Sequence, residues 1–265
     1  MKSAGWKDLD ILRIKGGYGA EEIDQVVVEM PLTIFINGRE FVTLLCSPIL
    51  LDCLAIGFLR SEGLLSSADD LQEIRLEEDK GFVHIWTAGD LDLEEKLYGK
   101  RTITSGCGKG TVFFNVLDSL QGRPVTSTLR INDETALMLM KEMQDNSALF
   151  KATGGVHSAA LADSERMLFY SEDIGRHNAV DKIVGRCLLE RIPLENKILL
   201  TSGRLSSEIV IKGAKIGFPI IVSRSAPTTL SVELAEELGI TLVGFARGRR
   251  LNIYTHLHRI TPTVE

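Results

Sequence analysis

Residues 172–182 form the densest polar run in this sequence, and several of its side chains can bind an ion or exchange a proton. The run opens with two acids and continues with Arg176 and His177 after a glycine. Residues 167–170 before it have the apolar character of a short buried strand, and apolar residues after it recur at helical spacing. The run is therefore predicted at the carboxyl end of a strand, where open α/β sheets bind ligands.

Arginine also follows the three strands that we predict later in the chain, at 198–201, 219–223 and 240–245. The segments after these strands contain Ser202, Gly203 and Arg204, then Arg224, and then Arg247, Arg249 and Arg250. Helix amino termini expose N–H groups and a partial positive charge, so arginine beside them favours phosphate binding. We predict a nucleotide-bearing ligand at this edge. The alternative is that the arginines are solvated or pair with nearby acids, namely Glu172, Asp173, Asp181 and Glu208.

Cys107 differs from the other three cysteines in its neighbours. It lies between two glycines in a glycine-rich segment, with Lys109 two residues later. That setting predicts an accessible sulfur and a nearby cation that lowers the thiol pKa. Cys46, Cys53 and Cys187 lie in apolar strand or helix patterns and are predicted to be core residues. An incidental surface cysteine remains the alternative for Cys107.

Two histidines lie in segments that favour a site. His177 is in the charged run, which favours a role as acid, base or hydrogen-bond donor to a ligand. His157 follows a glycine pair and precedes small residues that permit close packing, so a buried, hydrogen-bonded histidine is the alternative there. We predict no metal site, because the chain has no C-x-x-C pair.

Composition limits the class of protein. The chain has 265 residues with 44% hydrophobic content, which is enough for a substantial core. Its net charge of −6 argues against nonspecific binding of nucleic acid, which needs a positive surface. It has no apolar run of about 20 residues and no signal-peptide pattern at its start. We therefore expect a cytoplasmic protein that does not associate with membranes.

Three regions are predicted along the chain. Residues 1–20 lack periodicity and suggest a flexible arm, and residues 21–125 suggest a β-rich α+β subdomain that ends in the Cys107 loop. In that subdomain we predict strands at 25–30, 32–36, 41–46, 74–77 and 82–86, a hairpin turn at Asn37-Gly38, and a helix from Pro48 that ends at Gly63. Residues 126–265 form the third region.

The third region begins with a helix capped by Asn132 or Asp133. Strand and helix patterns then alternate, with helices predicted from Asn178, Leu205 and Thr228. Such alternation is typical of a mainly parallel sheet covered by helices. The predicted fold class is therefore α/β, with a smaller α+β subdomain at the amino terminus.

Several long motifs resemble those of the FdhD family, the formate dehydrogenase accessory sulfurtransferases. In chain order they are PLTIFINGREFVTLL, LAIGFLRSEGLL, SGCG, TGGVHSAAL, EDIGRHNAVDK, TSGRLSSE and GFARGRRLNIYTH. The resemblance implies a cytidine deaminase-like fold for residues 126–265. It also implies a homodimer that takes sulfur from a cysteine desulfurase as a persulfide on Cys107. That sulfur would pass to the molybdenum cofactor, a bis(molybdopterin guanine dinucleotide), before the cofactor enters formate dehydrogenase.

The resemblance also assigns residues to the cofactor pocket. Its core would be Phe245, Ala246, Arg247, Gly248, Arg249 and Arg250, joined by Arg176, His177, Ser202, Gly203 and Arg204. One feature departs from the family, in which many members have two cysteines in a C-G-x-C-G arrangement, whereas this chain has Gly110 in the second place. A noncatalytic chaperone that binds the cofactor without carrying sulfur therefore remains an alternative. A zinc deaminase is disfavoured, because His157 is not followed two residues later by a glutamate and no C-x-x-C pair exists.

Overall fold

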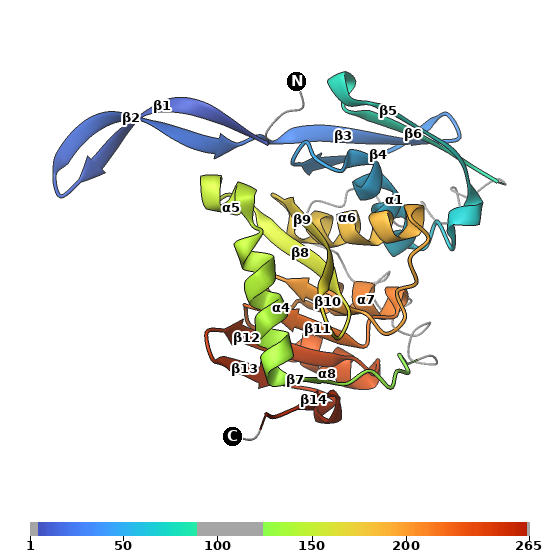
Figure 1. Cartoon of the computed structure of the whole chain (residues 1–265). Coiled ribbons are helices and arrows are strands. Elements are labelled where there is room, and N and C mark those ends of the chain that lie inside the picture. The colour runs from blue at the N-terminus through green and yellow to red at the C-terminus, as the bar shows by residue number, and fades with distance from the viewer. Residues whose placement is uncertain (1–4, 89–123, 264–265) are drawn as a thin grey trace.

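The computed structural model describes residues 5–88 and 124–263. Cys107 and Gly110 lie outside these ranges, and so does the glycine-rich loop predicted around them. The described chain contains a small sheet above a larger one, and a long two-stranded ribbon extends from the side of the molecule (Figure 1). No helix in the described ranges has the length and apolar character needed to span a bilayer.

The ribbon is the first difference from the sequence prediction. Strands β1 (Trp6–Lys15) and β2 (Tyr18–Val27) pair antiparallel over their full lengths. Residues 6–20, for which we predicted a flexible arm, are therefore regular strand structure. The Gly16-Gly17 pair is the hairpin turn, with positive φ at both residues. The strand pattern was hard to detect because the ribbon has no buried face; Leu12 and Ile14, for example, are 65% and 67% exposed.

The small sheet has the strand order β4-β3-β6-β5 and packs against one helix. Its elements are β3 (Met30–Ile36), β4 (Arg39–Cys46), α1 (Leu51–Glu62), β5 (Leu71–Glu77) and β6 (Phe82–Thr87), with short 3-10 turns at Ala68–Asp70 and Glu78–Lys80. The predicted turn at Asn37-Gly38 and the helix end at Gly63 are confirmed. The strand predicted at 25–30 is wrong, because residues 25–27 belong to β2 and Met30 begins β3.

The large sheet has the order β13-β12-β11-β10-β8-β9. Its strands are β8 (His157–Ala162), β9 (Met167–Asp173), β10 (Ile198–Thr201), β11 (Ile220–Ser223), β12 (Thr241–Arg247) and β13 (Arg250–Ile253). The pairs β10/β11 and β11/β12 are parallel, whereas β8 is antiparallel to both of its neighbours and β13 is antiparallel to β12. The sheet is therefore mixed rather than mainly parallel. The prediction was wrong because it missed β8 and β13, the two strands that pair antiparallel with their neighbours.

Helices cover both faces of the large sheet. They are α4 (Asp133–Asp145), α5 (Ala148–Thr153), α6 (Arg176–Leu189), α7 (Ser207–Ile216) and α8 (Thr229–Glu237), with a 3-10 turn at Leu257–Arg259 and the short strand pair β7 (Ile131–Asn132) and β14 (Ile260–Thr261). Leu199 and Ile221 face a core shared with α6, α7 and α8, whereas Leu200 and Val222 face the core shared with α4. The predicted cap of α4 is confirmed, because Asn132 accepts a hydrogen bond from the amide of Thr135.

The two sheets are joined where α1 crosses α6. A Cβ atom on Gly57 of α1 would lie 1.8 Å from the carbonyl oxygen of Asp181, and one on Gly185 of α6 would lie 1.8 Å from that of Cys53. The two helix backbones are therefore in direct contact, which only glycine permits at these two positions. This crossing connects the small sheet to the helix that begins with the charged run.

Candidate functional site

The predicted polar joints meet at one edge of the large sheet. Strands β9, β10, β11 and β12 all run in the same direction, since β9 is antiparallel to β8 and β8 is antiparallel to β10. Their carboxyl ends therefore share an edge with the amino termini of α6, α7 and α8. We predicted four neighbouring strands, but β8 lies between β9 and β10 and brings its first residue, His157, to the same edge.

Arg176 and His177 occupy the first turn of α6 and face Glu208 of α7. His177 Nε2 lies 3.0 Å from Glu208 Oε2, and Arg176 Nη2 lies 4.0 Å from the same oxygen. The pKa of the Glu208 carboxyl is lower than usual, chiefly because His177 Nε2 lies so close to it. The alternative in which an arginine pairs with a nearby acid is thus confirmed for Arg176. In the sequence Glu208 was named only as an acid that could pair with an arginine, and its contact with His177 was not predicted.

The predicted residues of the second joint lie against Arg176. A Cβ atom on Gly203 would be 3.1 Å from Cβ of Arg176, so these two segments are in close contact. Ser202 links two strands, since its Oγ accepts a hydrogen bond from the amide of Ser158 and its own amide donates to the carbonyl of Ser158. Arg204, one residue further, is exposed. The structure thus brings together the predicted site residues outside the 245–250 segment, which are Arg176, His177, Ser202, Gly203 and Arg204.

His157 joins this group at the start of β8. Its Nδ1 lies 3.5 Å from Ser202 Oγ. Burial lowers the pKa of the His157 imidazole, and the positive charges of Arg176, His177 and Arg204 lower it further. A neutral imidazole among cations can donate or accept a hydrogen bond without adding charge. His157 was noted in the sequence but not assigned to the site, because only the pairing of β8 with β10 shows where it lies.

The 245–250 segment covers the end of β12, the turn at Gly248 and Arg249, and the start of β13, beyond β11 along the same edge. Ala246 is fully buried, and the guanidinium of Arg247 lies 5.9 Å from the ring centroid of Phe245. Phe245 has a φ of 53°, which is strained for a side chain of that size, and the pairing of β12 with β13 shifts register between Gly244 and Arg247. Such strain is frequent at ligand sites and supports a binding role for this turn.

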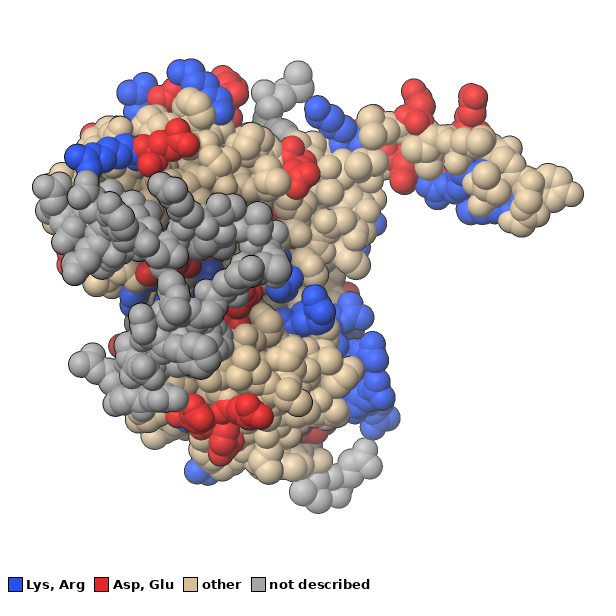
Figure 2. Space-filling model, turned by 180° about the vertical axis from the view of Figure 1, so that it is seen from behind, with Lys and Arg blue, Asp and Glu red and all other residues tan. Residues whose placement is uncertain are grey.

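Two strand spacings, roughly 10 Å, separate β10 from β12 along the edge. The β12–β13 turn lies on the left of the molecule in Figure 1. Figure 2 reverses that view and shows Lys and Arg side chains gathered on the corresponding right side of the large-sheet domain. An extended anionic ligand fits this arrangement better than a single phosphate. No group of three or more metal-ligating side chains occurs within residues 5–88 and 124–263.

The three cysteines in the described ranges are poor nucleophiles. Cys46, Cys53 and Cys187 are all buried, which confirms our prediction that they are core residues. Burial raises the pKa of each of these thiols to about 12. At neutral pH almost none of each is thiolate, which is the nucleophilic form. Among the cysteines of this chain, Cys107 is therefore the remaining candidate for sulfur chemistry.

We expect His157 to titrate below the ordinary histidine value of about 6.5. Because folding lowers the pKa of His157, the unfolded chain binds more protons than the folded protein below a pH of about 6.5. The free energy of unfolding therefore decreases as the pH falls below that value. The Arg176→Gln substitution should raise the titration midpoint by removing a nearby positive charge. Imidazole NMR titration checks this, with the exposed Arg130→Gln as a matched control that should leave the midpoint unchanged. A midpoint at or above the ordinary value in the wild type would contradict the cationic setting.

Comparison with known proteins gives one consistent family. A family model described as the FdhD/NarQ family matches residues 27–261. Similar curated proteins named sulfur carrier protein FdhD include one from Bacillus pumilus, 48% identical over 238 residues that cover 90% of this chain and 91% of the relative. Another, from Bacillus subtilis, is 45% identical over 251 residues that cover 95% of this chain and 96% of the relative.

A solved structure shares this arrangement of elements. It is a crystal structure from Desulfotalea psychrophila of a protein described as a formate dehydrogenase accessory protein. It matches with a TM-score of 0.78 at 28% sequence identity, and the match covers 97% of this chain and 99% of that chain. The α/β fold with a small additional sheet is therefore shared over nearly the whole length.

Proposed function

Because the chain belongs to the FdhD/NarQ family, we propose that it is a sulfur carrier that supports formate dehydrogenase. The observation that supports this most directly is the edge of the large sheet, where three helix amino termini, several arginines and the strained 245–250 turn lie together. That edge suits a substrate with several phosphate groups. We propose that its substrate is the molybdenum cofactor, a bis(molybdopterin guanine dinucleotide), held by Arg176, His177, Ser202, Gly203, Arg204 and the residues from Phe245 to Arg250.

Cys107 would carry the sulfur. Its thiolate attacks the outer sulfur of a cysteine desulfurase persulfide, a new S–S bond forms on Cys107, and the desulfurase leaves as a thiolate. This step is balanced and needs no oxidant. Releasing the carried sulfur as sulfide takes two electrons, which a second loop cysteine supplies when it forms a disulfide. Gly110 cannot do so, and an external thiol or the substrate's metal would have to supply them.

Other features of the proposal rest on the family resemblance. We propose a homodimer that works in the cytoplasm, with a large-sheet domain from residue 126 whose fold is like that of cytidine deaminase. The shared direction of β10, β11 and β12 and the helices on both faces support that fold. The proposed protein partners are a cysteine desulfurase and formate dehydrogenase. Nucleic acid is not a proposed partner, given the net charge of −6.

A noncatalytic chaperone is the second candidate, and Gly110 in place of a second cysteine is the observation that favours it. Such a protein would bind the cofactor at the arginine-rich edge and deliver it to formate dehydrogenase without carrying sulfur. The two candidates differ in what they require of Cys107. Both require the binding edge.

Restoration of formate dehydrogenase activity in cells that lack their own accessory protein separates the two candidates. We expect Cys107→Ala to abolish restoration, because the carrier loses its sulfur anchor. We expect Arg204→Ala combined with Arg249→Ala to abolish it as well, because the cofactor phosphates lose charged partners. The matched control is Arg130→Ala, an exposed arginine outside the edge. Activity retained by Cys107→Ala but lost with the arginine pair would favour the chaperone, and activity retained by both would contradict both candidates.

A further inference from the structure

A buried ion pair lies directly behind the candidate site. Lys182 Nζ is 2.6 Å from Asp173 Oδ2, and both side chains are fully buried. Moving two charges out of water carries a large free-energy cost for each ion, and the attraction between them often fails to exceed that cost. A fully buried pair is therefore weak evidence for added stability, and a role in fixing local geometry is the better explanation where the pair contacts a site.

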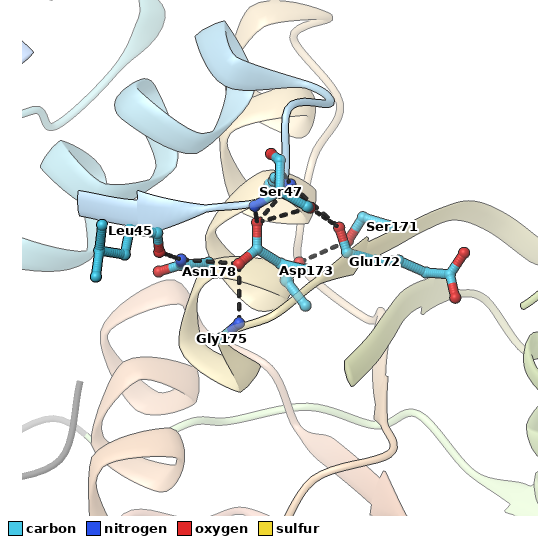
Figure 3. Close-up of polar contacts among 9 residues, drawn as sticks. Leu45, Ser47, Ser171, Glu172, Asp173, Gly175 and Asn178 are labelled. Atoms are coloured by element: carbon cyan, nitrogen blue, oxygen red, sulfur yellow. Dashed lines mark hydrogen bonds and ion pairs between the residues drawn. The ribbon is translucent and has the colours of Figure 1, made fainter. Parts of the chain in front are cut away.

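The Asp173 carboxylate contacts two parts of the chain that are far apart in sequence. On one side, Oδ1 accepts hydrogen bonds of 2.9 Å from the amide of Gly175 and from the side chain of Asn178. On the other side, Oδ2 accepts from the amide and the hydroxyl of Ser47, both at 3.1 Å. Figure 3 shows Asp173 between these two groups. One carboxylate thus connects the first turn of α6 to the segment after β4.

The connection is completed by further donors. Lys182 donates to Ser47 Oγ at 3.0 Å and to the carbonyl of Glu172 at 3.1 Å. Asn178 also donates to the carbonyl of Leu45 at 2.8 Å, which ties α6 to the end of β4 a second time (Figure 3). The polar atoms of Asp173 and Lys182 are therefore fully engaged between the two sheets. Two of the residues that they hold, Gly175 and Asn178, lie at the start of α6.

Arg176 and His177 lie in that first turn, immediately after Gly175. We propose that Asp173, with Lys182 and Ser47, positions Arg176 and His177 for ligand binding by fixing the start of α6 against the small-sheet subdomain. The inference rests on the proposed function, because it treats the edge as the binding site. Its consequence is that the small-sheet subdomain, which leads along the chain to Cys107, influences the geometry of the binding edge through Ser47.

The test replaces the charged pair with a neutral one, Asp173→Asn with Lys182→Met, so that no uncompensated charge is buried. The matched control is Asp181→Asn with Lys212→Met. That pair is also largely buried, with Lys212 Nζ at 2.6 and 2.7 Å from the Asp181 carboxylate oxygens, but it joins α7 to a later turn of α6. Guanosine diphosphate is the probe, its affinity is measured by calorimetry, and His157 is titrated by NMR in parallel.

We expect the Asp173/Lys182 double variant to bind guanosine diphosphate at least about tenfold more weakly than wild type, whereas the control stays within roughly threefold. The Asp173 carboxylate itself raises the pKa of His157, so its loss lowers the midpoint directly; the midpoint is therefore compared in Ser47→Ala, which keeps both charges. An affinity within roughly threefold of wild type would overturn the inference. If wild type fails to bind the probe, the proposed ligand is wrong, and the His157 midpoint of Ser47→Ala decides the positioning role.

A second comparison gives that midpoint, and it is also used if the variant with Asp173→Asn and Lys182→Met does not fold. Ser47→Ala keeps both charges and removes only the hydroxyl link to the small-sheet subdomain. Its matched control is Ser61→Ala, which removes a buried hydroxyl 2.6 Å from Asp181. We expect Ser47→Ala alone to weaken probe binding and raise the His157 midpoint. Equal behaviour of the two serine variants would contradict the inference.

Discussion

Lys182→Met alone should destabilise the folded protein by about 3–5 kcal/mol, the cost expected when one partner of a buried ion pair is removed. The substitution leaves the Asp173 carboxylate fully buried without its cation. The hydrogen bonds from Ser47 and Gly175 remain, but they do not neutralise the charge. Since domains are stable by only about 5–15 kcal/mol, this loss is a large share of the total.

Urea unfolding monitored by circular dichroism measures the effect. The matched control is Lys141→Met, which breaks an exposed pair with Asp145 on α4 and should cost less than about 1 kcal/mol. Adding Asp173→Asn to Lys182→Met should recover part of the loss, because the uncompensated charge disappears. A single variant as stable as its control would show that Asp173 and Lys182 do not form a charged pair in the folded protein.

Gly185→Ala should destabilise the protein by about 3 kcal/mol, at the upper end of the usual cost of overpacking. A methyl group at this position would lie 1.8 Å from the carbonyl oxygen of Cys53, so the backbones of α1 and α6 must separate. The usual gain in helix propensity from Gly to Ala, about 1 kcal/mol, is too small to offset this. Gly57→Ala should behave similarly, since its methyl would meet the carbonyl of Asp181.

Gly213→Ala is the matched control for the helix crossing. Gly213 is also within a helix, but its methyl would meet the end of the Ile221 side chain, which can rotate away. We expect a change of less than about 1 kcal/mol there, measured by thermal and urea unfolding of the purified protein. If Gly185→Ala proved as mild as Gly213→Ala, the close backbone contact between α1 and α6 would be wrong.

Much of the second half follows from local sequence patterns. Strand β10 matches its predicted range, and α7 and α8 begin within two residues of their predicted starts. These predictions succeed because a short apolar run followed by helical spacing specifies each element without distant contacts. The joints after the strands could be identified for the same reason. The gathering of Arg176, Ser202 and Gly203 then follows from the shared direction of their strands.

Other features depend on contacts between distant segments and had no local sign. Strand β8 consists mostly of small residues, and it is recognisable only from its pairing with β9 and β10. Glu208 reaches His177 across two helices, and Asp173 meets Ser47 across 126 positions of the chain. The ribbon lacked a buried face that would mark its strands. The role of Cys107 stays a prediction, because that residue lies outside the described ranges.

Mass spectrometry of the protein after incubation with a cysteine desulfurase and free cysteine tests the sulfur-carrier proposal most directly. Intact mass and peptide analysis are compared for wild type and Cys107→Ala. We expect one added, reducible sulfur on the Cys107 peptide of wild type and none in the variant, since the other three thiols are buried. Absence of the adduct with a competent desulfurase, or an equal adduct in Cys107→Ala, would contradict the proposal.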